Sequence, residues 1–72
     1  MKKKILVEFG KKIRAERLKQ SMSQEELAHK ASVHRTYIGM IERAEKNITL
    51  ENIEKLSKAL DLSIKDLFDN YR

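Results

Sequence analysis

The 72-residue chain contains no cysteine, no proline, no tryptophan and only two glycines. Without cysteine it can form neither a disulfide framework nor a thiolate metal site, so packing alone must stabilise its core. Scarce glycine and absent proline leave little of the turn chemistry that hairpins need, whereas the abundant leucine, lysine, glutamate, alanine and arginine favour helices. We therefore expect an all-α fold.

The sequence also lacks a long apolar run. Its first residues resemble the start of a signal peptide, but Glu8 interrupts the apolar stretch, and Lys11 and Lys12 follow directly. No segment approaches the roughly 20 apolar residues that a membrane-spanning helix requires. We expect a cytoplasmic protein without a membrane partner, built as one domain over residues 1–72 with its packed part at about residues 5–71.

Basic residues outnumber acidic ones, but only in the first two thirds of the chain. The formal net charge is +5. Residues 1–47 contain twelve Lys and Arg against six Asp and Glu, whereas residues 48–72 contain four against five. Such a surplus favours a polyanionic partner, although charged side chains on a small helical protein can also be merely solvated.

Apolar spacing and capping residues predict the first two helices. The first should run from Ile5 to Gln20, with an apolar stripe made of Ile5, Leu6, Phe9, Ile13 and Leu18. Ser23 and Glu26 have the S-x-x-E spacing of a capping box, in which each side chain accepts a hydrogen bond from the other residue's backbone N–H. A second helix should therefore begin directly after Ser23.

Three further helices are expected beyond a break near Ser32. The third should span about Arg35 to Arg43, and the short link before it is typical of a helix-turn-helix. A loop at residues 44–48 should follow. Thr49 should cap a fourth helix, and Ser63 a fifth. Their apolar positions are Leu50, Ile53, Leu56 and Leu60 in the fourth and Ile64, Leu67, Phe68 and Tyr71 in the fifth.

The third helix presents a chemically suitable face for reading DNA. Ile38 and Ile41 should point to the core, which leaves an opposite arc of Arg35, Thr36, Gly39, Met40 and Arg43. Arginine can donate two hydrogen bonds to guanine, and threonine or methionine can contact a thymine methyl. A glycine inside a helix costs about 1 kcal/mol, and close approach to a groove would explain it. Alternatively, these residues are an ordinary exposed surface.

Two residues at the margins of this helix should be half-buried. A partly buried carboxylate at Glu42 needs a cation, and Arg17, late in the first helix, is our candidate. Tyr37 can direct its hydroxyl to a phosphate, although a simple packing role fits equally well.

Three strings together resemble the Cro and phage-repressor class of helix-turn-helix domains, the XRE family. They are Ser23-Gln-Glu-Glu-Leu-Ala28, Val33-His-Arg-Thr-Tyr-Ile38 and Ile41-Glu-Arg43, and the likeness covers about residues 9–68. With Asn47-Ile-Thr-Leu50, the chain also resembles the controller proteins of restriction-modification systems. The family often has glycine where this chain has Ser32 and Ala44, so these turns should be either slightly strained or differently shaped.

The resemblance implies a five-helix, lambda-repressor-like domain whose second and third helices form the motif. It implies a transcription regulator that acts as a symmetric homodimer on a palindromic operator in double-stranded DNA, with RNA polymerase as a further candidate partner. Arg35 and Thr36 would then meet base edges, and Met40, on the same face of the helix, is a third candidate. The residues implied to hold phosphates are Gln24, Tyr37, Arg43, Lys46 and Asn47. The family also supports the pairing of Arg17 with Glu42.

The fifth helix carries more apolar surface than a small monomer needs. Ile64, Leu67, Phe68 and Tyr71 are therefore candidates for a two-fold interface, unless all of them close the monomer core.

Other functions have less support in the sequence. His29 and His34 are five residues apart, about 140° around a continuous helix, which is poor geometry for a shared metal, so exposed or capping roles are expected. No nucleophile motif surrounds any serine, and we expect no enzyme activity, cofactor or small-molecule ligand. Four Phe and Tyr residues offer no stacking platform for RNA. The alternative that remains is an antitoxin-type protein-binding module that also binds DNA.

Overall fold

The computed structural model describes residues 2–69 and 71, and in this part of the chain there are five helices and no strand. They are α1 (Lys4–Lys19), α2 (Gln24–Ala31), α3 (Arg35–Glu42), α4 (Leu50–Ala59) and α5 (Ile64–Leu67). The all-α prediction is confirmed, and each predicted helix start lies within one residue of the observed one. The fifth helix is shorter than expected, because it ends at Leu67 and leaves Phe68 and Tyr71 outside it. None of the described helices has the length and apolar content to cross a bilayer.

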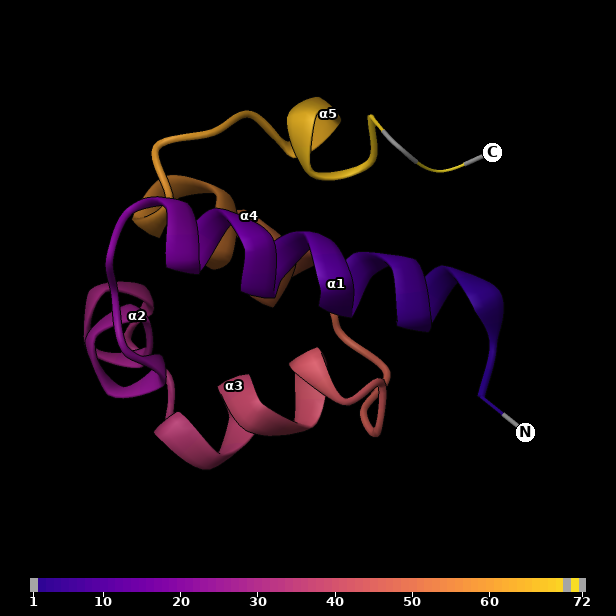
Figure 1. Ribbon diagram of the computed structural model, residues 1–72, viewed down its shortest axis with the longest axis horizontal. Coiled ribbons are helices and arrows are strands. Elements are labelled where there is room, and N and C mark those ends of the chain that lie inside the picture. The colour runs from indigo at the N-terminus through magenta and orange to yellow at the C-terminus, as the bar shows by residue number, and fades with distance from the viewer. Residues whose placement is uncertain (1, 70, 72) are drawn as a thin grey trace.

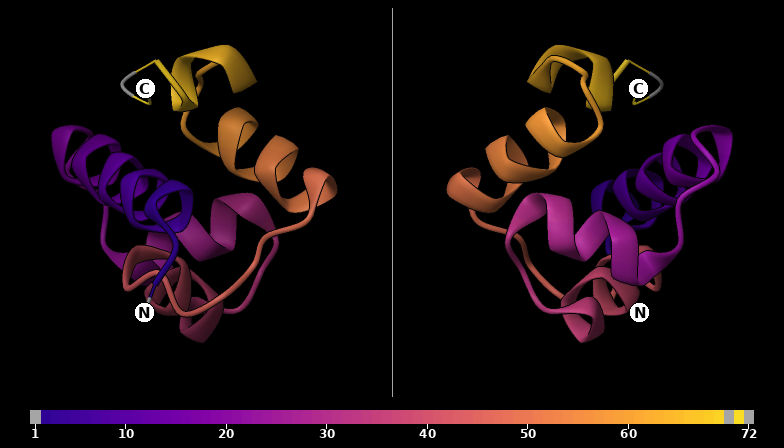
Figure 2. Two further views of the ribbon diagram at one scale, coloured as in Figure 1. Left: turned by 90° about the vertical axis from the view of Figure 1, so that its right-hand side faces the viewer. Right: turned by 90° about the vertical axis from the view of Figure 1, so that its left-hand side faces the viewer.

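The helices surround one core. In Figure 1, α1 crosses the molecule above α3, and α2 lies at one end of both. Figure 2 shows α1 and α4 on opposite sides above the α2–α3 pair, with α5 bridging their tops. Accordingly, α3 packs on α1 and α2, α4 packs on α2, and α5 contacts both α1 and α4. The α2–α3 pair thus projects from the side of the molecule opposite α5.

Each helix contributes to this core. Its most deeply buried side chains are Ile13, Leu27, Ile38, Leu56, Leu60 and Leu67. Ile41 is also buried, as predicted for the inner side of α3. The predicted burial is wrong for three residues of the apolar stripes. Ile5, Leu18 and Leu50 are 43%, 53% and 80% exposed. These residues lie near helix ends, where the apolar stripe runs past the neighbouring helices.

Side-chain caps explain where four of the helices begin. Ser23 forms the predicted capping box, since its hydroxyl accepts from Glu26 N and Glu26 Oε1 accepts from Ser23 N. Ser63 forms a second box with Asp66. Thr49 Oγ1 accepts from Asn52 N at the start of α4. At the start of α3 the cap is an imidazole, His34 Nδ1, which accepts from Thr36 N at 3.3 Å.

Four helices end in the same motif, and none uses glycine for it. Ser21, Ser32, Ala44 and Asp61 follow α1 to α4, and all four have left-handed φ values between 57° and 60°. At each end the next residue's N–H bonds back across five residues, as in Met22 N to Arg17 O and Val33 N to Ala28 O. The predicted strain at Ser32 and Ala44 is therefore present, because non-glycine residues adopt this conformation at a cost.

The two glycines of the chain lie inside helices instead. A Cβ built on Gly10 of α1 would lie 2.5 Å from the backbone oxygen of Ile41 and 2.9 Å from that of Glu42. Only a residue without a side chain allows α1 and α3 to approach this closely. Gly10 therefore sets the distance between α3 and the helix that supports it.

Candidate nucleic-acid interface

The N-terminal ends of α2 and α3 form a shallow polar hollow on the surface. Its volume is about 530 Å³, and its lining includes Ser23, Gln24, Glu25, Arg35, Thr36 and Arg43. Arg35 and Thr36 are exposed in the first turn of α3. This turn is fixed by the His34 cap, so Arg35 and Thr36, two of the three predicted base-reading residues, begin from a defined backbone position.

A buried ion pair anchors α3 to α1. Arg17 Nε and Nη2 donate to Glu42 Oε2 and Oε1 at 2.7 and 3.0 Å, and Arg17 Nη1 donates to Met22 O at 2.8 Å. The side chains of Arg17 and Glu42 are only 9% and 4% exposed. The hydrogen bonds that Arg17 donates to the Glu42 carboxylate raise the pKa of Arg17 in spite of burial. The predicted pair is therefore present, with the bidentate geometry that makes such pairs directional.

Gln24 belongs to the same network. Its Nε2 donates to Glu42 Oε1 at 3.0 Å, so the amide that we expected on a phosphate is already bonded inside the protein. Gln24 is half-buried at the first position of α2. Its position therefore couples the N-terminus of α2 to the C-terminal turn of α3.

Gly39 is less exposed than its position on α3 suggested. It is buried, not exposed. A Cβ at this position would lie 2.9 Å from Arg43 Nη1 and 3.6 Å from Gln24 Oε1. The absent side chain thus makes room for the Arg43 guanidinium to lie back along α3. The nearest atom is the end of a flexible arginine side chain that is 56% exposed, so close approach of Gly39 to a DNA groove stays a prediction. Met40, beside it, is half-buried.

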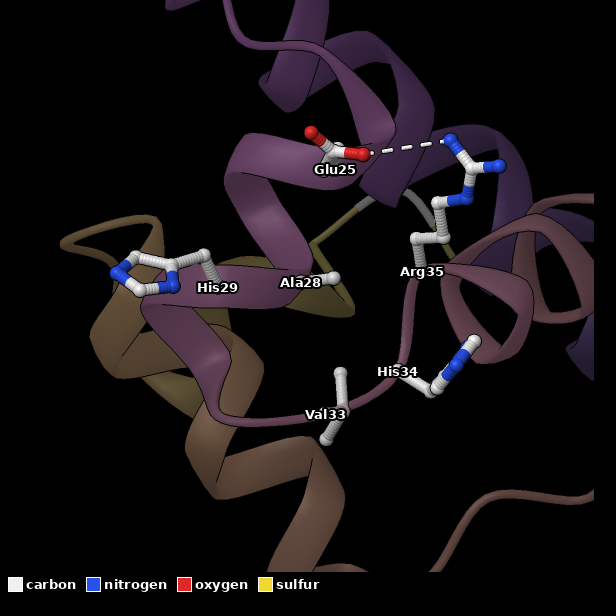
Figure 3. Close-up of a pocket in the computed structure, with 6 residues that line it drawn as sticks. All are labelled: Glu25, Ala28, His29, Val33, His34 and Arg35. Carbon is white, nitrogen blue, oxygen red and sulfur yellow. Dashed lines mark hydrogen bonds and ion pairs between the residues drawn. The ribbon is translucent and has the colours of Figure 1, made fainter.

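The Arg35 guanidinium lies opposite a carboxylate of α2. Arg35 Nη1 is 3.3 Å from Glu25 Oε2, and the two side chains are 68% and 73% exposed (Figure 3). An exposed pair of this kind contributes little, typically about 0–1 kcal/mol. Arg35 is therefore held loosely and can exchange this partner for another hydrogen-bond acceptor.

Tyr37 is half-buried, as predicted, and its hydroxyl oxygen accepts a hydrogen bond from Asn52 Nδ2 at 2.9 Å. The sequence did not point to Asn52, which lies in the first turn of α4. Because a phenol can accept and donate at once, the hydroxyl of Tyr37 can still donate a hydrogen bond to a phosphate. The structure therefore accommodates both roles that the sequence left open for this residue.

The remaining predicted phosphate-binding residues follow the end of α3. Arg43, Lys46 and Asn47 are all exposed. Arg43 Nε lies 3.1 Å from Glu45 Oε1 in another exposed ion pair. The loop at residues 44–47 therefore presents its polar side chains to solvent beside α3.

The predicted dimer surface requires one correction. Leu67 is only 2% exposed within a single chain, because α5 closes the core with it, so it has no surface to offer a second copy. Phe68 is half-buried and stacks on Phe9 with ring centroids 5.1 Å apart. Ile64 and Tyr71 remain 41% and 40% exposed. Leu50, which we had assigned to the core, is far more exposed than either.

The two histidines are not arranged as metal ligands. Both line a small hollow with Glu25, Ala28, Val33 and Arg35, yet their imidazoles point apart (Figure 3). Over the described residues, no group of three or more His, Cys, Asp or Glu side chains could hold a metal ion. His34 instead caps α3, which is one of the roles that the sequence suggested.

Comparison with known proteins connects this geometry to a family. Residues 13–67 match the family model described as helix-turn-helix. The control protein C.BamHI of Bacillus amyloliquefaciens is 56% identical over 62 residues, which cover 85% of this chain and 76% of that protein.

Two solved structures are similar over most of the chain. The restriction-modification controller protein C.AhdI of Aeromonas hydrophila has a TM-score of 0.87 and 42% identity, covering 89% of this chain and 97% of its own. The second structure is the controller protein C.Esp1396I as a tetramer in complex with its natural 35-base-pair operator. It has a TM-score of 0.86 and 36% identity, and the match covers 93% of this chain and 88% of that chain.

Proposed function

Because this chain belongs to the helix-turn-helix family and its relatives include restriction-modification controller proteins, we propose that it is a transcription regulator that reads double-stranded DNA with α3. The observation that carries the proposal is the arrangement of α3 itself. Its far end is locked to α1 by the buried Arg17–Glu42 pair, while Arg35 and Thr36 stand exposed in its first turn. A rigid helix with a polar exposed face is what the major groove admits.

The proposed contacts divide by chemistry. Arg35 and Thr36 read base edges, with half-buried Met40 at the edge of this group. We assign contacts with the phosphates of the DNA backbone to Gln24, Tyr37, Arg43, Lys46 and Asn47. Of these, Gln24 contributes through its position more than through its amide, since Nε2 is bonded to Glu42. Its backbone N–H, at the N-terminus of α2, is well placed to meet a phosphate.

We propose that the active form is a symmetric homodimer. The relative C.Esp1396I binds its operator as a tetramer, and this chain exposes Leu50, Ile64 and Tyr71. Two copies related by a two-fold axis would place their α3 helices in successive major grooves, about 34 Å apart. The operator would then be an inverted repeat.

Selection of bound sequences from random duplex DNA tests this proposal. We expect an inverted repeat whose half-site centres lie about 10 base pairs apart. Arg35→Ala should weaken binding to the selected site by about 1–3 kcal/mol and narrow its advantage over random DNA. Lys46→Ala should weaken binding to the selected site and to random DNA about equally. Lys55→Ala, on the exposed side of α4, serves as the charge-matched control. Recovery of no palindromic consensus at moderate salt would overturn the proposal.

The regulatory role follows from the relatives. We propose that the protein controls the genes of a restriction-modification system, its own included, that it acts in the cytoplasm on DNA-bound RNA polymerase, and that it has no enzyme activity. Transcription in vitro from a template that carries the selected site tests this role. Transcript levels that stay constant as the protein concentration rises would contradict it. An endonuclease gene beside this one would support the controller assignment.

A further inference from the structure

The residues that precede α1 reach the C-terminal end of α3. Lys2 Nζ donates a hydrogen bond to the backbone oxygen of Arg43, the residue that caps α3. Figures 1 and 2 show the chain turning away from the start of α1 toward the end of α3. Lys2 therefore contacts the residue that precedes the loop at residues 44–47, although the two are more than forty positions apart in the sequence.

This end of the molecule carries a local surplus of positive charge. Lys2, Lys3, Arg43 and Lys46 are all exposed. Among the acidic residues at this end, Glu45 is paired with Arg43, and Glu42 is neutralised by the buried Arg17. Like charges held together on a surface repel one another, and an anion that contacts several of them relieves the repulsion.

Capping of α3 accounts for only part of what Lys2 can do. A cation is favourable at a helix C-terminus, where free carbonyl oxygens carry the negative end of the helix dipole. An ammonium group has three donors, and the bond to Arg43 O uses one of them. A carbonyl does not neutralise the charge either. Two donors and a full positive charge therefore remain at the surface.

We propose that Lys2, with Lys3 beside it, binds the DNA backbone and extends the interface past the end of α3. The inference rests on the proposed function and adds a second, distant segment of the chain to the phosphate-binding surface around Arg43 and Lys46. Ammonium groups act on phosphates as point charges and read no sequence. Lys2 and Lys3 thus contribute to affinity for any duplex, and not to the choice of operator.

Lys4 provides a matched control in the same segment. Its Nζ lies 5.8 Å from the ring centroid of Tyr71, so its side chain is directed toward the C-terminal part of the chain. Lys4 is exposed and has the same chemistry as Lys2. Removing either charge changes the net charge of the protein by one, but Lys2 bonds to the end of α3 and Lys4 lies beside Tyr71.

The test is the salt dependence of binding to a duplex of random sequence and to the selected operator. For Lys2→Gln we expect the slope of log K against log salt to fall in magnitude by about 1, with a loss of roughly threefold to tenfold in affinity near 0.1 M salt for both duplexes. Lys2→Gln combined with Lys3→Gln should lower the slope further. Lys2→Arg should restore the slope, and Lys4→Gln should leave it close to the wild-type value.

The outcomes separate this inference from the proposed function. A Lys2→Gln slope equal to that of Lys4→Gln would overturn the inference, even if affinity and melting temperature fell, because Lys2 would then be only a helix cap. A wild-type protein that prefers no inverted repeat would overturn the proposed function, while the slopes on random duplex would still decide the role of Lys2. Failure of the wild-type protein to bind any duplex would overturn both.

Discussion

The buried pair of Arg17 and Glu42 is the residue-scale feature on which the position of α3 most depends. Removing one partner leaves the other charge buried without compensation, which typically costs about 3–5 kcal/mol. Glu42→Ala should therefore lower the free energy of unfolding by roughly 3 kcal/mol or more, measured by urea unfolding. Glu25→Ala removes a carboxylate whose side chain is 73% exposed, and should cost less than about 1 kcal/mol. Similar losses in the two variants would contradict the buried role of Glu42.

At this scale, sequence reasoning succeeded where the chemistry allowed few solutions. A carboxylate at the margin of an apolar helix face needs a cation, and this requirement predicts the pairing of Glu42 with Arg17. Gln24 was different, because an amide can bond to a phosphate or to a neighbour, and only the packing of α2 on α3 places Nε2 on Glu42. The burial of Gly39 likewise depends on how α2 and the Arg43 side chain lie over α3.

Among the secondary-structure elements, the turn between α2 and α3 is strained in a way that can be relieved. Ser32 adopts φ 58° and ψ 42°, a left-handed conformation that glycine adopts with less strain. Ser32→Gly should therefore raise the free energy of unfolding by about 1 kcal/mol, measured by urea unfolding. Ala15→Gly, at an exposed position inside α1, introduces the same residue and should lower it by about 1 kcal/mol. A loss in the Ser32 variant would show that the turn is not under strain.

The capping box at the start of α2 should make stability depend on acidity. Hydrogen bonds from the backbone and the side chain of Ser23 lower the pKa of Glu26. A lowered pKa in the folded state means that the stabilisation is present above the unfolded value, about 4.3, and is lost as the pH falls through the folded value. Glu26→Gln should therefore show a smaller loss of stability than the wild type between about pH 5 and pH 3. If urea unfolding showed the same loss of stability for both proteins between about pH 5 and pH 3, this expectation would be contradicted.

Helix starts were more predictable from the sequence than helix ends. Ser23, Thr49 and Ser63 each identified the residue before a helix, because a hydroxyl that accepts an N–H bond is a local signal. The ends lacked their usual signal, since no glycine occupies the left-handed positions. The length of α5 was overestimated for a related reason. Apolar residues at helical spacing continue to Tyr71, but the chain leaves the helix after Leu67.

For the whole molecule, the fold supports α3 from within and leaves its outer side free. Gly10 allows close contact between α1 and α3, and the ion pair of Arg17 with Glu42 joins the same two helices. Part of the basic surplus of residues 1–47 lies at the C-terminal end of α3, because Lys2 folds back to Arg43. The sequence showed the surplus, but only the tertiary structure shows that residues 2 and 43 lie together.

The state of assembly can be tested at an exposed apolar residue that contributes little to the monomer. Leu50 is 80% exposed and precedes Ile53 by one helical turn, and Ile53 lines a hollow of about 140 Å³ together with Phe68 and Ile5. Leu50 therefore adds exposed apolar surface at the start of α4. If this surface joins two copies, burial of one leucine is worth about 1.5–3 kcal/mol. Leu50→Gln should then raise the dissociation constant of the dimer roughly tenfold or more in sedimentation equilibrium, with little change in melting temperature.

Leu18→Gln, at a residue 53% exposed near the end of α1, should leave the dimer intact. Equal weakening by both substitutions would place the interface elsewhere.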